Sequence, residues 1–285
     1  MADGYKAVAV ETRYWKPGED YIQDIILAIK NIVTEEDWIT VSEKAISTAL
    51  GNITDETKVK PSRLAHFIAK YWMRIVWPYI LGPICHLRKK TISFLRSYPP
   101  DEGSFHKQLA LEQSGFLQAL MHGSEGGVDG SNLPYSYVCF PLENAEEVAN
   151  ELRKRIEKEH GKKISVAIVD TDKTYSLKGF HFTPHPKPIK GIYSFGGVLA
   201  YVVGRSLKLK KRATPIAISG AKITTEEAIE VAKIANRTRG AGAGRTVWDM
   251  AKTFNVGITE VTWKMLSSVK HYPVVIIRPN ANEFV

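Results

Sequence analysis

Apolar residues follow two different periods along this chain. Isoleucines at positions 22, 25, 26, 29 and 32 recur at helical spacing and predict an amphipathic helix that ends near Val33. Short apolar runs, most of them rich in β-branched residues, predict strands at 6–10, 38–42, 164–169, 214–219 and 273–277, the first of them buried. Helices and strands alternate irregularly, which favours an α/β or mixed α+β fold over an all-α or all-β chain.

Two capping boxes mark the starts of further helices. Asn144-x-x-Glu147 is expected to begin a helix that runs to Gly161, and Thr224-x-x-Glu227 one that covers 226–235. In such a box, the side chains of the first and fourth residues bond each other's backbone N–H groups.

The middle of the chain is harder to assign. A small helical piece is expected at 45–50, and the Pro- and Gly-containing stretch 97–106 is predicted to be a loop. The periodicity of 109–121 fits a strand as well as a helix, and the run before Gly126 suits a buried strand.

Residues 61–95 are predicted to be helical, with interruptions at Pro78 and Pro83. Their mixture of aromatic and basic side chains suits a helical pair packed on the core or on a second subunit. It also suits a membrane surface or nucleic acid, although no recognised nucleic-acid motif is present. The sequence leaves these alternatives open.

Charge and cysteine content narrow the class of protein. The 39 Lys and Arg residues exceed the 30 Asp and Glu residues, so the net charge is +9 and anionic partners are favoured. Two cysteines form neither a disulfide framework nor a metal-binding spacing, which indicates a reducing, cytoplasmic setting. No signal-peptide pattern or run long enough for a membrane span is present.

Two acidic motifs carry candidate chemistry. Residues 126–132 read Gly-Gly-Val-Asp-Gly-Ser-Asn and contain Asp129 and Asn132, and Asp170 and Thr171 directly follow the strand predicted at 164–169. Each motif alone is also good turn or cap chemistry. Together they supply only oxygen ligands, which predicts a hard cation, Mg²⁺ or Mn²⁺, bridging phosphates rather than zinc.

A third motif is rich in glycine. Residues 239–246 read Arg-Gly-Ala-Gly-Ala-Gly-Arg-Thr, so Arg239 and Arg245 flank a backbone that can approach phosphate closely. The segment is not a P-loop, and a flexible surface loop explains it equally well. His181 and His185 are predicted to lie in a loop or strand, because the neighbouring prolines exclude a helix.

In order, these motifs resemble those of the coenzyme F-420 gamma-glutamyl ligase family, which joins L-glutamate to a lactyl-phosphate deazaflavin with GTP and divalent metal. The resemblance covers nearly the whole chain, 1–285, as a single unit with two lobes. The matching segments are Lys16-Pro17-Gly18-Glu19-Asp20, Ile46-Ser47-Thr48-Ala49-Leu50-Gly51, Gly127 to Asn132, Val169-Asp170-Thr171, Arg239-Gly240…Gly244-Arg245 and Pro273 to Arg278.

The chain also departs from the family pattern. Thr48 stands in place of a lysine associated with nucleotide phosphates, and Leu50 in place of a glutamate. Residues 265–268 replace a Met-Gly-Gln/Glu element, and residues 52–120, helix-rich in their first part, are more aromatic and basic than expected. The chain therefore looks like a divergent relative.

The resemblance implies a two-lobed ligase-like fold with mixed sheets that forms an intertwined homodimer. By the same analogy, Asp129 and Asp170 would hold one metal and Thr171 a second. Contacts to nucleotide would come from Arg13, Tyr14, Trp15, Ser47 and Asn132.

The reaction implied is carboxylate activation by phosphoryl transfer from GTP, or ATP, followed by attack of an amine such as that of L-glutamate. Arg239 and Arg245 would clamp phosphate or a small anionic substrate. The alternative is an inactive relative that binds nucleotide or a phosphorylated metabolite. A basic protein that binds RNA or a membrane through 61–95 is the third hypothesis.

Overall fold

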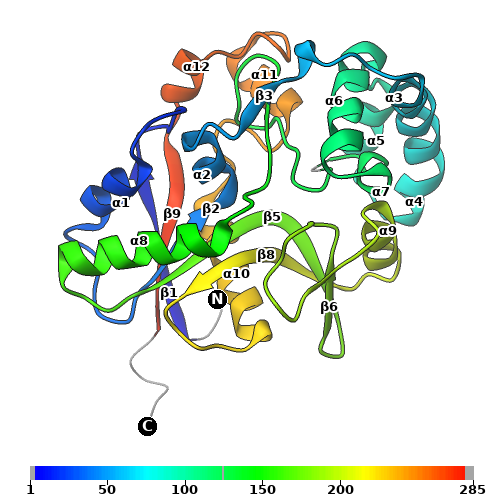
Figure 1. Cartoon of the computed structure of the whole chain (residues 1–285). Helices are drawn as coiled ribbons and strands as arrows, with labels where there is room; N and C mark the ends of the chain where they lie inside the picture. The colour runs from blue at the N-terminus through cyan, green and yellow to red at the C-terminus, as the bar shows by residue number, and fades with distance from the viewer. Residues whose placement is uncertain (1–3, 124, 280–285) are drawn as a thin grey trace.

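A mixed seven-stranded sheet forms the centre of the computed structural model, which describes residues 4–123 and 125–279 (Figure 1). The strand order is β1-β9-β2-β5-β6-β7, with β8 paired to β5, and the β2–β5 and β6–β7 pairs are parallel. The strands are β1 (Tyr5–Thr12), β2 (Trp38–Ser42), β5 (Ser165–Leu177), β6 (Phe180–Thr183), β7 (Tyr193–Ser194), β8 (Lys210–Ser219) and β9 (His271–Pro279). The predicted mixed α/β class is confirmed.

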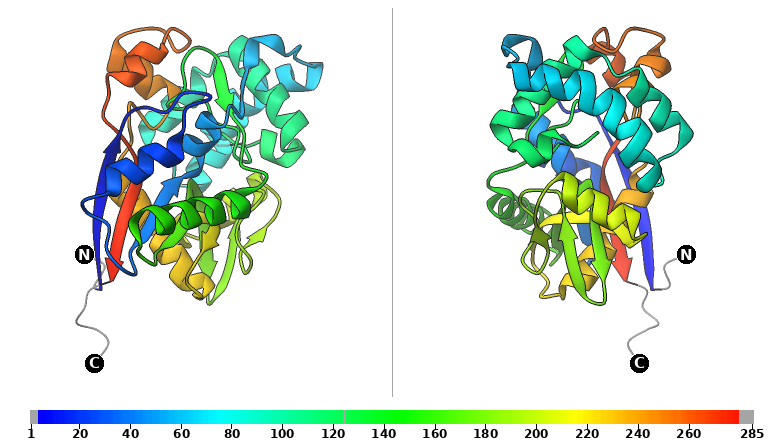
Figure 2. Two further views of the ribbon diagram at one scale, coloured as in Figure 1. Left: turned by 60° about the vertical axis from the view of Figure 1, so that its left-hand side comes forward. Right: turned by 90° about the vertical axis from the view of Figure 1, so that its right-hand side faces the viewer.

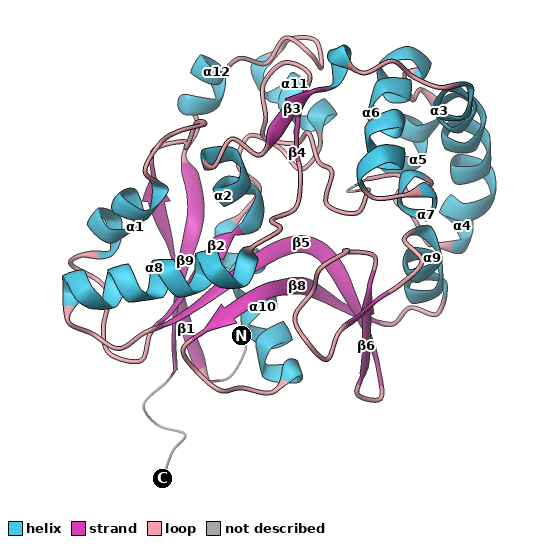
Figure 3. Ribbon diagram, in the orientation of Figure 1, coloured by secondary structure: helices cyan, strands magenta, loops and turns pink. Residues whose placement is uncertain are grey.

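Helices cover both faces of this sheet (Figure 3). Because side chains alternate along a strand, Ile39 and Val41 of β2 enter one core and Trp38 enters the other. The first core is closed by α1 (Tyr21–Ile29), α2 (Glu43–Ala49) and α8 (Ala145–His160), and the second by α10 (Thr225–Arg239).

A separate block of helices packs around Met73 and Trp77 and holds most of residues 61–119 (Figure 2). Its longest member is a continuous helix over residues 63–84 that includes π-helical hydrogen bonding, such as Gly82 N to Trp77 O. The interruption predicted at Pro78 was wrong, because the proline lies inside this helix. The block consists of α3 (Arg63–Phe67), η2 (Ile68–Leu81), α4 (Gly82–Ile84), α5 (Lys89–Arg96), α6 (Pro100–Gln113), α7 (Phe116–Ala119) and α9 (Val198–Ser206). None of the helices in the described part of the chain is long and apolar enough to cross a membrane.

Smaller elements connect the sheet and the helical block. A two-stranded ribbon of β3 (Ile53–Asp55) and β4 (Tyr137–Cys139) leads to the short helix η1 (Glu56–Lys58). Helices α11 (Val247–Phe254) and α12 (Trp263–Ser267) lie between α10 and β9 in the chain.

Four further predictions about local structure were wrong. Residues 97–106 are not a loop, because Pro100 occupies the first turn of α6 and the acidic side chains that follow it suit a helix N-terminus. The chain before Gly126 forms the short helix α7 (Phe116–Ala119), and none of the described residues 120–123 and 125 belongs to the expected strand. Strand β1 is an edge strand and not buried, so that Val8 is 57% exposed. Asn144 starts α8 without a side-chain capping bond, whereas the Thr224–Glu227 box is formed.

Candidate functional site

The acidic motif at Asp170 and Thr171 lies where the parallel pairing of β2 and β5 ends. The last paired residues are Ser42 and Val169, so Glu43 and Lys44 open α2 beside Asp170. The prediction that Asp170 follows the strand was wrong. Asp170 lies inside β5, because this strand continues to Leu177 by pairing with β6 and β8. The β5–β8 register shifts between Asp170 and Lys173, and this irregularity marks the point where the polar residues interrupt the apolar strand.

The acidic motif at 126–132 is held by backbone hydrogen bonds to β4. Asp129 pairs with Cys139 of β4 in both directions, with N···O distances of 3.2 and 3.1 Å. Its side chain accepts from Ser131 N at 2.7 Å and forms an ion pair with the Lys44 ammonium, which also donates to Ser131 Oγ. Burial alone would lower the pKa of Lys44, but the charge and hydrogen bond of Asp129, together with the charge of Asp170, raise it, so Lys44 is a cation.

Asp129 and Asp170 line one cavity of about 390 Å³, together with Asn132 and Thr171. Four basic side chains line the same cavity, so its walls carry more positive than negative charge and suit an anion with several charges. They are Lys44, Lys173, Arg239 and Arg245. A volume of this size is within the range of small-molecule and cofactor sites.

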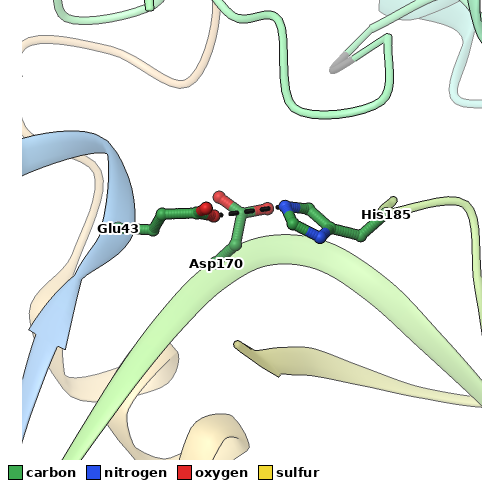
Figure 4. Close-up of side chains that lie close together, drawn as sticks. All are labelled: Glu43, Asp170 and His185. Carbon is green, nitrogen blue, oxygen red and sulfur yellow. Dashed lines mark hydrogen bonds and ion pairs between the residues drawn. The ribbon is translucent and has the colours of Figure 1, made fainter. Parts of the chain in front are cut away.

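Asp170 is only 9% exposed, yet it is held in its ionised form. Burial would raise its pKa, but the facing His185 and the backbone N–H of Asp172, which donates to Asp170 Oδ1 at 2.7 Å, lower it. Glu43, Asp170 and His185 offer one ligand atom each within 4.8 Å of one another, and all three are buried (Figure 4). His185 Nε2 lies 3.2 Å from Glu43 Oε2, and these neighbours raise the pKa of His185 to about 9 in spite of its burial.

Asn132 fastens the glycine-rich loop to the acidic motif. Its Oδ1 accepts from Ala243 N at 2.8 Å and its Nδ2 donates to Gly244 O at 2.9 Å. The carbonyl of Asn132 accepts from Tyr14 Oη at 2.6 Å. The loop therefore takes a defined shape over the cavity, and Arg239 and Arg245 both reach the cavity wall.

We expect Asn132→Ala to free this loop. Losing two hydrogen bonds of about 1 kcal/mol each should increase opening of residues 240–246 by about tenfold or more. Hydrogen exchange followed by mass spectrometry measures this directly. Asn150→Ala on α8, which removes the amide that accepts from Ser219, is the matched control and should leave exchange of the loop unchanged.

A second cavity of about 500 Å³ adjoins the first. The two share Asp129, Ser131, Thr171 and Arg245, so a molecule in one can touch a molecule in the other. Its lining includes five aromatic residues from the helical block and the segments near it: Tyr98, Phe105, Tyr135, Tyr137 and Trp248. This arrangement suits two substrates that meet at the shared residues.

The structure brings most of the candidate residues together, with two exceptions. Tyr14 and Trp15 line the first cavity with the metal and phosphate candidates. Arg13 instead lines a different hollow, where it pairs with Asp24 at 2.6 Å. Ser47 is completely buried in α2, away from the cavity wall, and its Oγ has no hydrogen-bond partner among the described residues.

Three residues of the site were missed in the sequence: Glu43, Lys44 and His185. The first two directly follow the strand at 38–42, and charged residues after a buried strand were the signal that identified Asp170. No local signal identifies His185, which reaches Asp170 from beyond β6.

Most of the chain matches a known protein family. The family model described as F420-0:Gamma-glutamyl ligase matches residues 9–246. An uncharacterized protein of Methanocaldococcus jannaschii is 35% identical over 96% of both chains. Coenzyme F420:L-glutamate ligase of the same organism is 26% identical over 58% of this chain and 59% of its own length.

Proposed function

The chain belongs to the F420-0:gamma-glutamyl ligase family, and we propose that it is an amide-forming ligase. It would activate a carboxylate with GTP, or ATP, and a divalent cation, and join it to an amine such as that of L-glutamate. The convergence of Asp129, Asp170 and Thr171 with four basic side chains in one cavity is the observation that supports this most.

The residues present fit Mg²⁺ or Mn²⁺. Asp129, Asp170 and the Thr171 hydroxyl supply hard oxygen donors, and the lowered pKa of Asp170 keeps its carboxylate ready to bind a cation. Bound there, the cation would neutralise negative charge on the nucleotide phosphates.

The chain's own side chains would position the reacting groups. Arg239, Arg245 and Lys173 would contact phosphate oxygens while a carboxylate oxygen attacks the γ-phosphorus and the bond to the leaving diphosphate breaks. The amine nitrogen would then attack the acyl carbon and release phosphate, with loss of the amine proton. In this proposal the body of the carboxylate substrate occupies the aromatic second cavity, with its carboxylate at the shared residues Thr171 and Arg245.

An inactive relative that binds nucleotide or a phosphorylated metabolite is the second candidate. The Lys44 ammonium pairs with Asp129, one of the proposed metal ligands, which favours this candidate because the charge of that carboxylate is already balanced. Leu50 stands in place of a family glutamate, is half exposed and lines neither cavity. The missing carboxylate also favours the inactive relative.

Turnover and binding separate the two candidates. We expect the protein to bind GTP or ATP only with Mg²⁺ or Mn²⁺ and to release phosphate when a carboxylate substrate and an amine are added. Asp129→Asn should abolish both. Metal-dependent binding without phosphate release, over a panel of acids, would favour the inactive relative, and no nucleotide binding at all would contradict both.

The homodimer is part of the same proposal. Sedimentation velocity at several protein concentrations should show a dimer. A monomer that turns over substrate would remove the dimer from the proposal without affecting the reaction.

A further inference from the structure

The long helix of the helical block exposes a row of large apolar side chains. Along residues 63–84 they recur at intervals of three or four positions, with Tyr79 and Ile80 adjacent, on the side that faces away from Met73 and Trp77. Phe67 and Tyr79 are 56% and 59% exposed. We call this row the apolar stripe; it consists of Leu64, Phe67, Tyr71, Ile75, Tyr79, Ile80 and Ile84. In the right-hand view of Figure 2 the helix crosses the face nearest the viewer. Exposed apolar surface of this extent marks an interaction site.

The segment that carries the stripe also carries the whole net charge of the protein. Residues 57–100 contain nine Lys and Arg and no Asp or Glu, whereas the rest of the chain has 30 basic and 30 acidic residues. Eight of the nine basic side chains are exposed, and Lys90 is the one that forms an ion pair within the described residues, with Asp249. The segment that carries the stripe is therefore strongly positive.

Cations and aromatic rings of this surface lie against each other. The Arg96 guanidinium lies 4.8 Å from the centre of the Tyr79 ring, and Lys70 Nζ lies 5.4 Å from that of Tyr71. A helix with aromatic and aliphatic residues on one side and basic residues beside them is the pattern of helices that lie in a membrane interface.

We propose that the apolar stripe and its basic border dock the protein on an anionic lipid bilayer. The apolar side chains would enter the boundary between headgroups and acyl chains while Lys70, Arg96 and Arg63 contact lipid phosphates. A second copy of this chain is a poor occupant, because two copies of a segment with nine basic and no acidic residues would repel each other. Nucleic acid would use the basic residues but would leave the aliphatic ones, such as Ile75 and Ile80, without a partner.

Flotation with lipid vesicles tests this proposal independently of any ligase activity. We expect the protein to float with vesicles of phosphatidylcholine containing about one third phosphatidylglycerol, at least about tenfold more tightly than with phosphatidylcholine alone. About 0.5 M salt should release most of it, because salt screens the attraction. Equal binding to both kinds of vesicle, or no binding to either, would overturn the proposal.

Two double variants separate the contributions of basic and of apolar side chains to vesicle binding. Lys70→Glu with Arg96→Glu should weaken binding to the anionic vesicles at least about tenfold. Phe67→Ser with Ile75→Ser should do the same with the charge unchanged. The matched controls are Lys30→Glu and Leu27→Ser at α1, which lies across the molecule in Figure 1, and they should bind like the wild type.

Self-association and RNA binding are the competing outcomes. If Phe67→Ser with Ile75→Ser converts a dimer to a monomer in sedimentation velocity and vesicles do not bind, the stripe is a subunit interface and the proposal fails. If vesicles do not bind but a homopolymer RNA does, with loss in Lys70→Glu and Arg96→Glu, the surface binds nucleic acid and the proposal also fails. Unchanged thermal unfolding of each variant shows that the fold is intact.

Discussion

Replacing Asp170 by asparagine is expected to slow nucleotide-dependent amide formation by about 10²–10³-fold, or about 3–4 kcal/mol of transition-state stabilisation. Asparagine has nearly the same shape, and its carbonyl can still accept from Asp172 N. The variant therefore keeps the local backbone but loses the buried negative charge that would hold a divalent cation beside the phosphates. Asp170 also contributes to the raised pKa of His185 and Lys44, so its charge organises the cavity.

Single-turnover phosphate release at several Mg²⁺ concentrations measures the effect. If Asp170 holds the cation, the midpoint for Mg²⁺ should move to higher concentration in Asp170→Asn, in addition to the fall in rate. Asp101→Asn, an exposed change in the first turn of α6, is the control and should leave both unchanged. A full rate in Asp170→Asn would exclude the proposed metal site.

The convergence of Asp129 and Asp170 in one cavity was predictable because both motifs combine oxygen ligands with strand ends or turns. The strand at 38–42 was predicted with its observed bounds, since its apolar run ends at the polar pair Glu43 and Lys44. The roles of these residues stay predictions until turnover and metal binding are measured.

The features that could not be predicted from the sequence depend on contacts between distant residues. Asp170 lies inside β5 because β6 and β8 extend the pairing beyond the apolar run, and local periodicity carries no information on those partners. His185 reaches Asp170 only through that same extension. Ser47 matched a family motif, but α2 turns it into the core and presents Lys44 to the cavity instead. Sequence motifs identify residue types near a site, whereas side-chain direction follows from packing.

Glu125→Gln is expected to destabilise the protein by about 3–5 kcal/mol, because it removes one partner from a buried charge network. Lys107, completely buried in α6, donates to Glu125 Oε1 at 2.6 Å, and His106 Nε2 lies 2.8 Å from Oε2. The other ring nitrogen of His106 bonds Glu56, so both nitrogens face carboxylates and the ring is an imidazolium. Without Glu125, the buried Lys107 and the partly buried His106 share the single charge of Glu56.

Urea unfolding measures the change, and the control is Glu112→Gln on the exposed side of α6, which should cost less than about 0.5 kcal/mol.

The expected loss of stability becomes smaller both as the pH falls and as the pH rises. Burial alone would raise the pKa of Glu125, but Lys107 and His106 lower it, so its contribution is present above about pH 4.5 and is lost as the pH falls. The pKa of His106 is raised to about 10 against the effect of burial, so its contribution is complete below about pH 6.5 and is lost as the pH rises toward 10.

The difference in stability between wild type and Glu125→Gln should therefore be largest near pH 5–6.5 and should shrink on both sides of that window. A difference that does not change with pH would show that packing, and not charge, accounts for the loss.

The buried charge network also connects the stability of the protein to the candidate site. Glu125 pairs with Val128 through the backbone, one residue before Asp129, so the buried charges of α6 fix the turn that presents the Asp129 carboxylate to the cavity.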